Sequence, residues 1–257
     1  MKTINLTIPR SWDKLTPSQL VFISSLFLQG LTKQAFLLKA FICLAGLKIL
    51  PGRFGTKYNP SYLFARGKNK FSLRLGQIIY FSKDCEFLLR ERDRFNPVPA
   101  IGGRKARSVL MHDANFSEFI SALVYYNQVN KLPDDRVTLL KLCAVMYPDR
   151  SWDPDNIKID CFKEETNETC YTSYLWFGFV LNRVASECPD LFRAGENNSE
   201  PVSLRDNVHA MYNLVTGGDI TKEKEVAKLP VWRVLCDMND KARNIKEMNE
   251  KLNSNGI

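Results

Sequence analysis

His112 and His209 are the only histidines in the chain, and a nucleophilic enzyme needs a base of this kind beside its nucleophile. His112 stands next to an acid in LMHDAN, and Cys143 or Cys161 could be imagined as the nucleophile. A lone histidine in a loop, however, is far more often a surface residue, and the sequence contains neither G-x-S-x-G nor H-E-x-x-H. We therefore predict no catalytic site.

The seven cysteines do not have the spacing of a metal site. Structural zinc sites use C-x2–4-C pairs, whereas Cys161 and Cys170 are nine residues apart with no histidine near them. The segment PGRFGTK is similar in outline to a phosphate-binding loop, but Gly52 and Gly55 are too close together and the threonine precedes the lysine. Most cysteines lie in apolar runs, so we expect reduced thiols and no metal, nucleotide or other cofactor.

A basic and aromatic segment carries a stronger signal. Apolar residues alternate around RGKNK, which predicts a β-hairpin over residues 62–75. Such a hairpin can lie along phosphates and stack bases, although solvated lysines on an exposed turn give the same pattern and no nucleic-acid motif accompanies it. Nucleic-acid binding is therefore the alternative function, and its candidate residues are Arg66, Lys68, Lys70 and Arg74.

Helix signals are clear near the N-terminus. The run TPSQ at residues 16–19 has the form of a capping box with proline at the first helical position, and Gly30 is placed to end that helix. Thr32 predicts the cap of a second helix that ends near Gly46. Neither apolar run reaches the ~18 to 20 residues of a membrane span, so we expect two core helices rather than a membrane hairpin or a partner-binding arm.

The whole pattern predicts a mainly α-helical fold. Ile4, Leu6 and Ile8 alternate in a way that favours a short N-terminal strand. Helical periodicity resumes in NFSEFISALVYYNQVNK, RVTLLKLCAVMYP and TSYLWFGFVLNRVASECPDLF. The expected fold is helical, with the short N-terminal strand and a small β-hairpin near residues 62–75.

Composition and charge suggest how the chain is divided. A length of 257 residues with 45% hydrophobic residues is enough for one large or two small globular domains. Residues 48–107 carry 14 Lys and Arg against 4 Asp and Glu, whereas residues 108–257 carry 17 against 23. With NPVPAIGGRKARSVLMHDA as the boundary, we predict a basic helical region over residues 1–100 and an acidic one over 101–257, or one continuous domain.

The last segment has the a/d spacing of a coiled-coil seam over three heptads. A final helix folded back on its own core has the same spacing. The residues after Met238 are charged on most faces, so we expect the second half of the helix to fray or to dock onto another chain. The candidate partner-binding residues are Val231, Leu235, Met238, Ala242, Ile245, Asn249 and Leu252.

Several short segments resemble a family of uncharacterised helical proteins from phage and prophage tail gene clusters. They are SWDKLTPSQLVFISSLF, NPVPAIGGRK, LLKLCAVMYP, CPDLF and LPVWRVLCDMNDKARNIKEMNEK. The resemblance implies a non-enzymatic role in virion assembly, like a tail-assembly chaperone or a structural component, and it assigns no site residue.

We therefore expect a non-enzymatic assembly or interaction protein with a protein partner, possible self-association and no membrane contact. MKTINLTIPR lacks the apolar core of a secretory signal, which predicts the cytoplasm, that of the host if the chain is phage-encoded. Nucleic-acid binding and a hydrolase with an unrecognised site remain the open alternatives.

Overall fold

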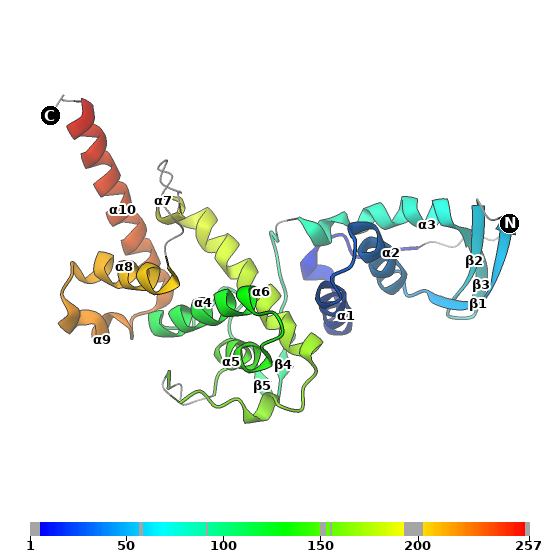
Figure 1. Ribbon diagram of the computed structural model, residues 1–257, viewed down its shortest axis with the longest axis horizontal. Helices are drawn as coiled ribbons and strands as arrows, with labels where there is room; N and C mark the ends of the chain where they lie inside the picture. Colours follow the sequence, from blue (N-terminus) through cyan, green and yellow to red (C-terminus); the bar gives the residue numbers. More distant parts are fainter. Residues whose placement is uncertain are drawn as a thin grey trace. The chain divides into compact units, whose positions relative to one another are not determined.

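The computed structural model describes residues 6–56, 59–90, 92–149, 153–154, 156–192 and 203–254. The chain divides into two compact units, Met1–Val98 with Thr166–Thr172, and Pro99–Glu165 with Ser173–Ile257. Helices predominate, accompanied by two small antiparallel sheets, so the prediction of a mainly α-helical fold is confirmed (Figure 1). Within the described ranges, no helix is both long and apolar enough to cross a membrane.

The first unit begins with the 3-10 helix η1 (Trp12–Lys14), followed by α1 (Pro17–Leu28) and α2 (Lys33–Leu44). The capping box is present, because Gln19 N–H donates to Thr16 Oγ1 at 3.3 Å and Thr16 N–H donates to Gln19 Oε1 at 2.9 Å. Gly30 has a φ of +58°, a left-handed conformation that glycine adopts without strain at a helix end. Further along the chain, α3 (Leu75–Ser82) and η2 (Lys83–Leu89) follow the sheet.

The sheet of the first unit has the antiparallel order β1 (Lys48–Thr56), β2 (Asn59–Arg66) and β3 (Asn69–Arg74). The β2–β3 hairpin is the predicted one, and it pairs Phe64 with Phe71. β1 was not predicted, because its Pro and Gly residues are typical of turns, and its register with β2 shifts in the middle. The predicted N-terminal strand is wrong for residues 6–10, which form no strand, and Ile4 lies outside the described residues.

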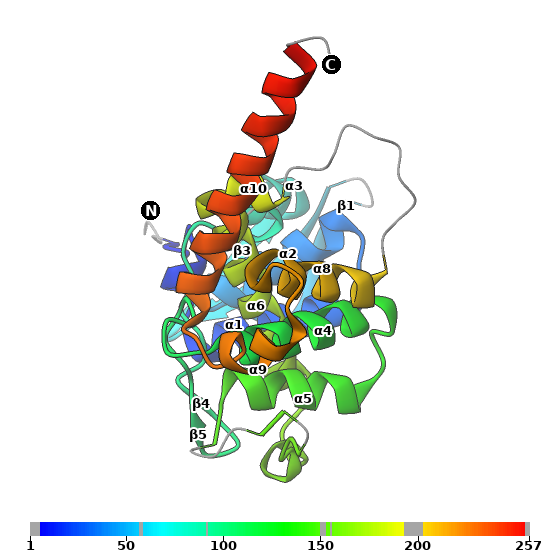
Figure 2. The ribbon, with the colours of Figure 1, turned by 90° about the vertical axis from the view of Figure 1, so that its left-hand side faces the viewer.

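The second unit contains the hairpin β4 (Ala100–Ile101) and β5 (Arg104–Lys105), then α4 (Phe116–Lys131) and α5 (Arg136–Met146), which pack together. The remaining elements are η3 (Asp160–Phe162), α6 (Asn167–Glu187), α7 (Pro189–Phe192), α8 (Leu204–Thr216), η4 (Ile220–Lys222), α9 (Glu223–Val226) and α10 (Val231–Ser254). The middle of α10 packs on α7 and α8, where Asn239 Oδ1 accepts from Asp190 N–H and Lys241 Nζ donates to Val215 O, and the helix then extends past them (Figure 2).

Candidate interaction surfaces

The first two turns of α10 are anchored in the second unit. Trp232 Nε1 donates to the carbonyl oxygen of Leu110 at 2.7 Å. Val231, Leu235 and Met238 are each at most 1% exposed. These three predicted partner-binding residues therefore belong to the core of the second unit. An amphipathic helix buries its apolar face wherever other elements of the same unit pack against it.

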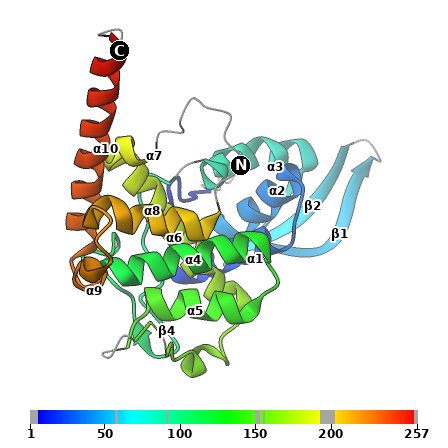
Figure 3. The same ribbon diagram turned by 60° about the vertical axis from the view of Figure 1, so that its left-hand side comes forward.

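The second half of α10 projects beyond the other helices of this unit and is exposed from residue 243 to residue 252 (Figure 3). Ile245 is 53% exposed and Leu252 is 48% exposed. Ala242 is half-buried, and Asn249 is exposed. Met248, 65% exposed, was missed because it does not fit the a/d spacing. We call Ile245, Met248 and Leu252 the overhanging stripe, because at ~100° per residue they lie within about 60° of one another on the helix.

The overhanging stripe continues the buried face of α10, with a cation at each end. The buried Met238 lies on the same side of the helix. Lys241 lies on the stripe itself at its base, where its Nζ donates to Val215 O and forms an ion pair with Asp237, each at 2.9 Å. Lys251 lies about 90° to one side. Glu247 and Glu250 lie roughly 130° or more from the centre of the stripe, on the far side of the helix.

The basic residues predicted to contact nucleic acid are divided between the two faces of the sheet. Side chains alternate between faces along a strand, so Lys70 and Arg74 of β3 share one face. Arg66 of β2 points to the other face, with the buried Phe64. Lys68 lies exposed in the turn. The predicted set is therefore not one surface.

The register adds a residue that the sequence did not single out. Lys48 of β1 lies opposite Ala65, which in turn pairs with Lys70, so these side chains share a face. Lys48, Lys70 and Arg74 are all exposed, and we call them the basic sheet face. Phe54, 56% exposed, lies on the same face.

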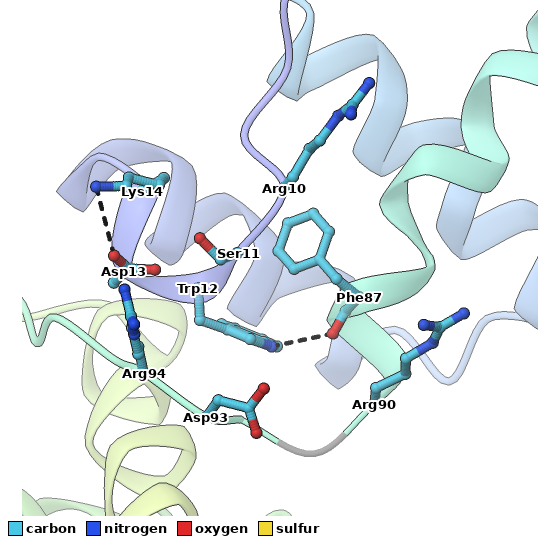
Figure 4. A pocket seen from close by; sticks show the side chains of 9 residues that line it. All are labelled: Arg10, Ser11, Trp12, Asp13, Lys14, Phe87, Arg90, Asp93 and Arg94. Carbon is cyan, nitrogen blue, oxygen red and sulfur yellow. Dashed lines mark hydrogen bonds and ion pairs between the residues drawn. The ribbon is translucent and has the colours of Figure 1, made fainter.

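A pocket of about 630 Å³ opens beside Trp12 in the first unit (Figure 4). The indole ring is 3% exposed, and its Nε1 donates to the carbonyl oxygen of Phe87 at 3.2 Å. In Figure 4, Arg94 lies on the Asp13 side of the ring and Arg90 on the Phe87 side. Among the described residues, its lining is Arg10, Ser11, Trp12, Asp13, Lys14, Phe87, Arg90, Asp93 and Arg94. We call it the Trp12 pocket.

The candidate catalytic residues have structural partners. The ring of His112 packs against the ring of Trp232, with 5.6 Å between the ring centroids. Cys143 Sγ lies 3.1 Å from Ser173 Oγ in the core. Burial raises the pKa of Cys161, which disfavours a reactive thiolate. No group of three or more His, Cys, Asp or Glu residues in the described part of the chain could hold a metal ion.

No protein-family model, curated protein or solved structure matches this chain.

Proposed function

We propose that this chain is a non-enzymatic interaction protein that binds a partner chain along the overhanging stripe of α10. The observation that carries the proposal is the apolar face of α10, which is buried at Met238, interrupted by Lys241 and about half exposed from Ile245 to Leu252. Full burial of such a side chain contributes about 1.5–3 kcal/mol, so covering the three half-exposed ones contributes roughly 3 kcal/mol. A helix that leaves this face uncovered is suited to docking.

The charge around the overhanging stripe indicates the kind of partner. Lys241 is already neutralised by Asp237 at 2.9 Å, so Lys251 supplies the positive charge beside the stripe. A second copy of α10 docked in parallel register would bring Lys251 close to the same cation, which is unfavourable. An amphipathic helix with glutamate or aspartate beside its apolar seam places opposite charges there. We therefore propose a different protein with an acidic, apolar helix as the partner.

The biological setting is also part of the proposal. The resemblance to proteins of phage tail gene clusters supports a role in tail assembly, chaperone-like or structural, in the host cytoplasm.

A fluorescent peptide tests the proposal, with leucine at its seam positions and glutamate beside them. Anisotropy titration should show that the full chain binds it and that Ile245→Asp with Leu252→Asp weakens binding at least about tenfold, because docking would desolvate the new carboxylates. The melting temperature should barely change, since both side chains are about half exposed in the free chain.

The matched control replaces Leu132 and Val137, apolar residues of the same unit that are 64% and 52% exposed, by aspartate. This control should bind the peptide like the wild type. Equal weakening by both double variants contradicts the proposal, as does a much lower melting temperature of the Ile245 and Leu252 variant with binding unchanged.

Nucleic-acid binding is the second candidate function, and the basic sheet face is the observation that favours it. Three exposed cations and the exposed Phe54 share one solvent-facing surface, a combination that suits a single strand through phosphate contacts and stacking.

A further inference from the structure

Two cysteines of the second unit are held next to each other. Cys188 is the residue before α7, and Cys236 lies in the second turn of α10, which packs on α7 (Figure 3). Asp190 links the two elements at this contact. Its N–H donates to Asn239 Oδ1 at 2.9 Å, and its Oδ2 accepts from Arg243 Nε at 3.2 Å.

The helical positions place Cys236 on the side of α10 that faces Asp190. At ~100° per residue, Cys236 lies about 20° from Arg243 and about 60° from Asn239 around the helix. Cys188 precedes Asp190 by only two residues, so both cysteines lie at the same contact between α7 and α10. Both are free, and the two thiol groups interact through a side-chain hydrogen bond.

The two thiols differ in their access to solvent. Cys236 is exposed, whereas Cys188 is only 1% exposed. Burial, and then the neighbouring thiol of Cys236, raise the pKa of Cys188 to about 11. A buried thiol with a raised pKa is inert toward an oxidant in solution, so an oxidant reacts first at Cys236. An exposed thiol with a second thiol beside it to resolve the oxidised form is typical of redox-sensitive cysteines.

We propose that Cys188 and Cys236 form a reversible disulfide when hydrogen peroxide oxidises the chain, which links the start of α7 covalently to α10. The Cys236 sulfur attacks one peroxide oxygen, so an S–O bond forms and the O–O bond breaks, and the leaving hydroxide takes the thiol proton to become water. The Cys188 sulfur then attacks the Cys236 sulfur, so an S–S bond forms and the S–O bond breaks. The second hydroxide leaves with the Cys188 proton as water. The two sulfurs together lose two electrons, and the peroxide gains them.

The disulfide lies on the other side of α10 from the overhanging stripe. Cys236 and Ile245 are nine residues apart, which is about 180° around the helix. Oxidation therefore leaves the stripe uncovered, but it fixes the anchored half of α10 to α7 and closes the chain between residues 188 and 236. Such a cross-link restricts the unfolded chain, so the oxidised protein should unfold at a higher urea concentration than the reduced protein.

Peroxide treatment of the full chain tests the proposal, followed by alkylation of the remaining thiols, protease digestion and mass spectrometry. The wild type should lose about 2 Da, the mass of two hydrogens, and give a cross-linked peptide that joins Cys188 to Cys236. A thiol reductant should reverse both changes. Cys188→Ala should leave Cys236 as a sulfenic acid, which dimedone traps and which excess peroxide oxidises to the sulfinic acid. Cys236→Ser should leave Cys188 unoxidised.

The matched control is Cys161→Ser, which removes a half-buried thiol of the same unit and should form the cross-link like the wild type. In concentrated urea the wild type should instead give mixed cross-links among its seven cysteines, because unfolding separates the pair. The proposal is overturned if the native wild type keeps both thiols, if its cross-link joins two chains or another pair of cysteines, or if urea leaves the pattern unchanged. Ile245→Asp with Leu252→Asp should form the disulfide like the wild type, so failure here is distinguishable from failure of the overhanging-stripe proposal.

Discussion

Replacing Arg107 by alanine should destabilise the second unit strongly, because this side chain holds together three parts of it. Arg107 Nε donates to Val145 O at 2.6 Å, and Nη1 donates to Asp113 O at 3.3 Å. Its Nη2 forms an ion pair with Glu118, and the two side chains are only 3% and 7% exposed. The other carboxylate oxygen of Glu118 accepts from Asn115 N–H at 2.8 Å.

The magnitude follows from what the substitution leaves behind. Alanine leaves the carboxylate of Glu118 buried without its cation and two carbonyl groups without their donor. Removing one partner of a buried pair costs about 3–5 kcal/mol, a large part of the ~5–15 kcal/mol that stabilises a typical domain. At ~2–4 °C per kcal/mol for a domain of 150–250 residues, the melting temperature should fall by roughly 6–20 °C.

Urea unfolding followed by circular dichroism measures this loss, with Arg183→Ala as the matched control. Arg183 forms an exposed ion pair with Glu187 at 2.6 Å in α6, and its loss should cost under ~1 kcal/mol. Arg107→Met combined with Glu118→Leu should recover much of the stability, since no charge is left unpaired. A loss below ~1 kcal/mol for Arg107→Ala, or no recovery in the double variant, would refute the reasoning.

Two further predictions concern the first unit. If oligothymidine binds the basic sheet face, Lys70→Gln with Arg74→Gln should reduce the slope of log affinity against log salt concentration by about 1.4. Arg66→Gln, on the opposite face, should change this slope less. Titrations between about 50 and 200 mM salt measure both slopes, and equal effects of the two changes would contradict the assignment. Burial raises the pKa of Cys85 from 9.0 to about 12. Above pH 9 the folded state therefore keeps a proton that the unfolded state loses. The contribution of Cys85 to the free energy of unfolding should be constant below pH 9 and fall above it. Cys85→Ala should lack this part of the decline in urea unfolding between pH 8 and 10.5, and identical pH profiles would count against it.

Local signals in the sequence predicted much of the first unit. The capping box at Thr16 and the turn at RGKNK depend on residues only a few positions apart, and both are present. The order of residues is sufficient for such features, because the hydrogen bonds that define them close within one turn.

The candidate surfaces could not be predicted in the same way. The face on which Arg66 lies depends on the register of β2 with β3. Lys48 belongs to the basic sheet face only because β1 pairs with β2, and β1 could not be predicted because its Pro and Gly residues are typical of turns. Arg10 and Arg94 are far apart in sequence and line one pocket only because Trp12 packs against η2, where Phe87 O accepts from its Nε1. Such neighbours are set by tertiary packing, which leaves no periodic signal in the chain.

The two halves of α10 show why spacing alone does not separate core from interface. Met238 and Ile245 are one heptad apart on one face, yet the first is 1% exposed and the second 53%, because the body of the unit lies opposite only the first. The anchored half also supports the exposed one. An isolated helix of about 12 residues is marginal in water because nucleation is costly, whereas here Trp232 and the buried turns fix the helix before any partner arrives. A partner that docks on the overhanging stripe therefore meets a helix that is already formed, and its binding is opposed less by the loss of backbone entropy.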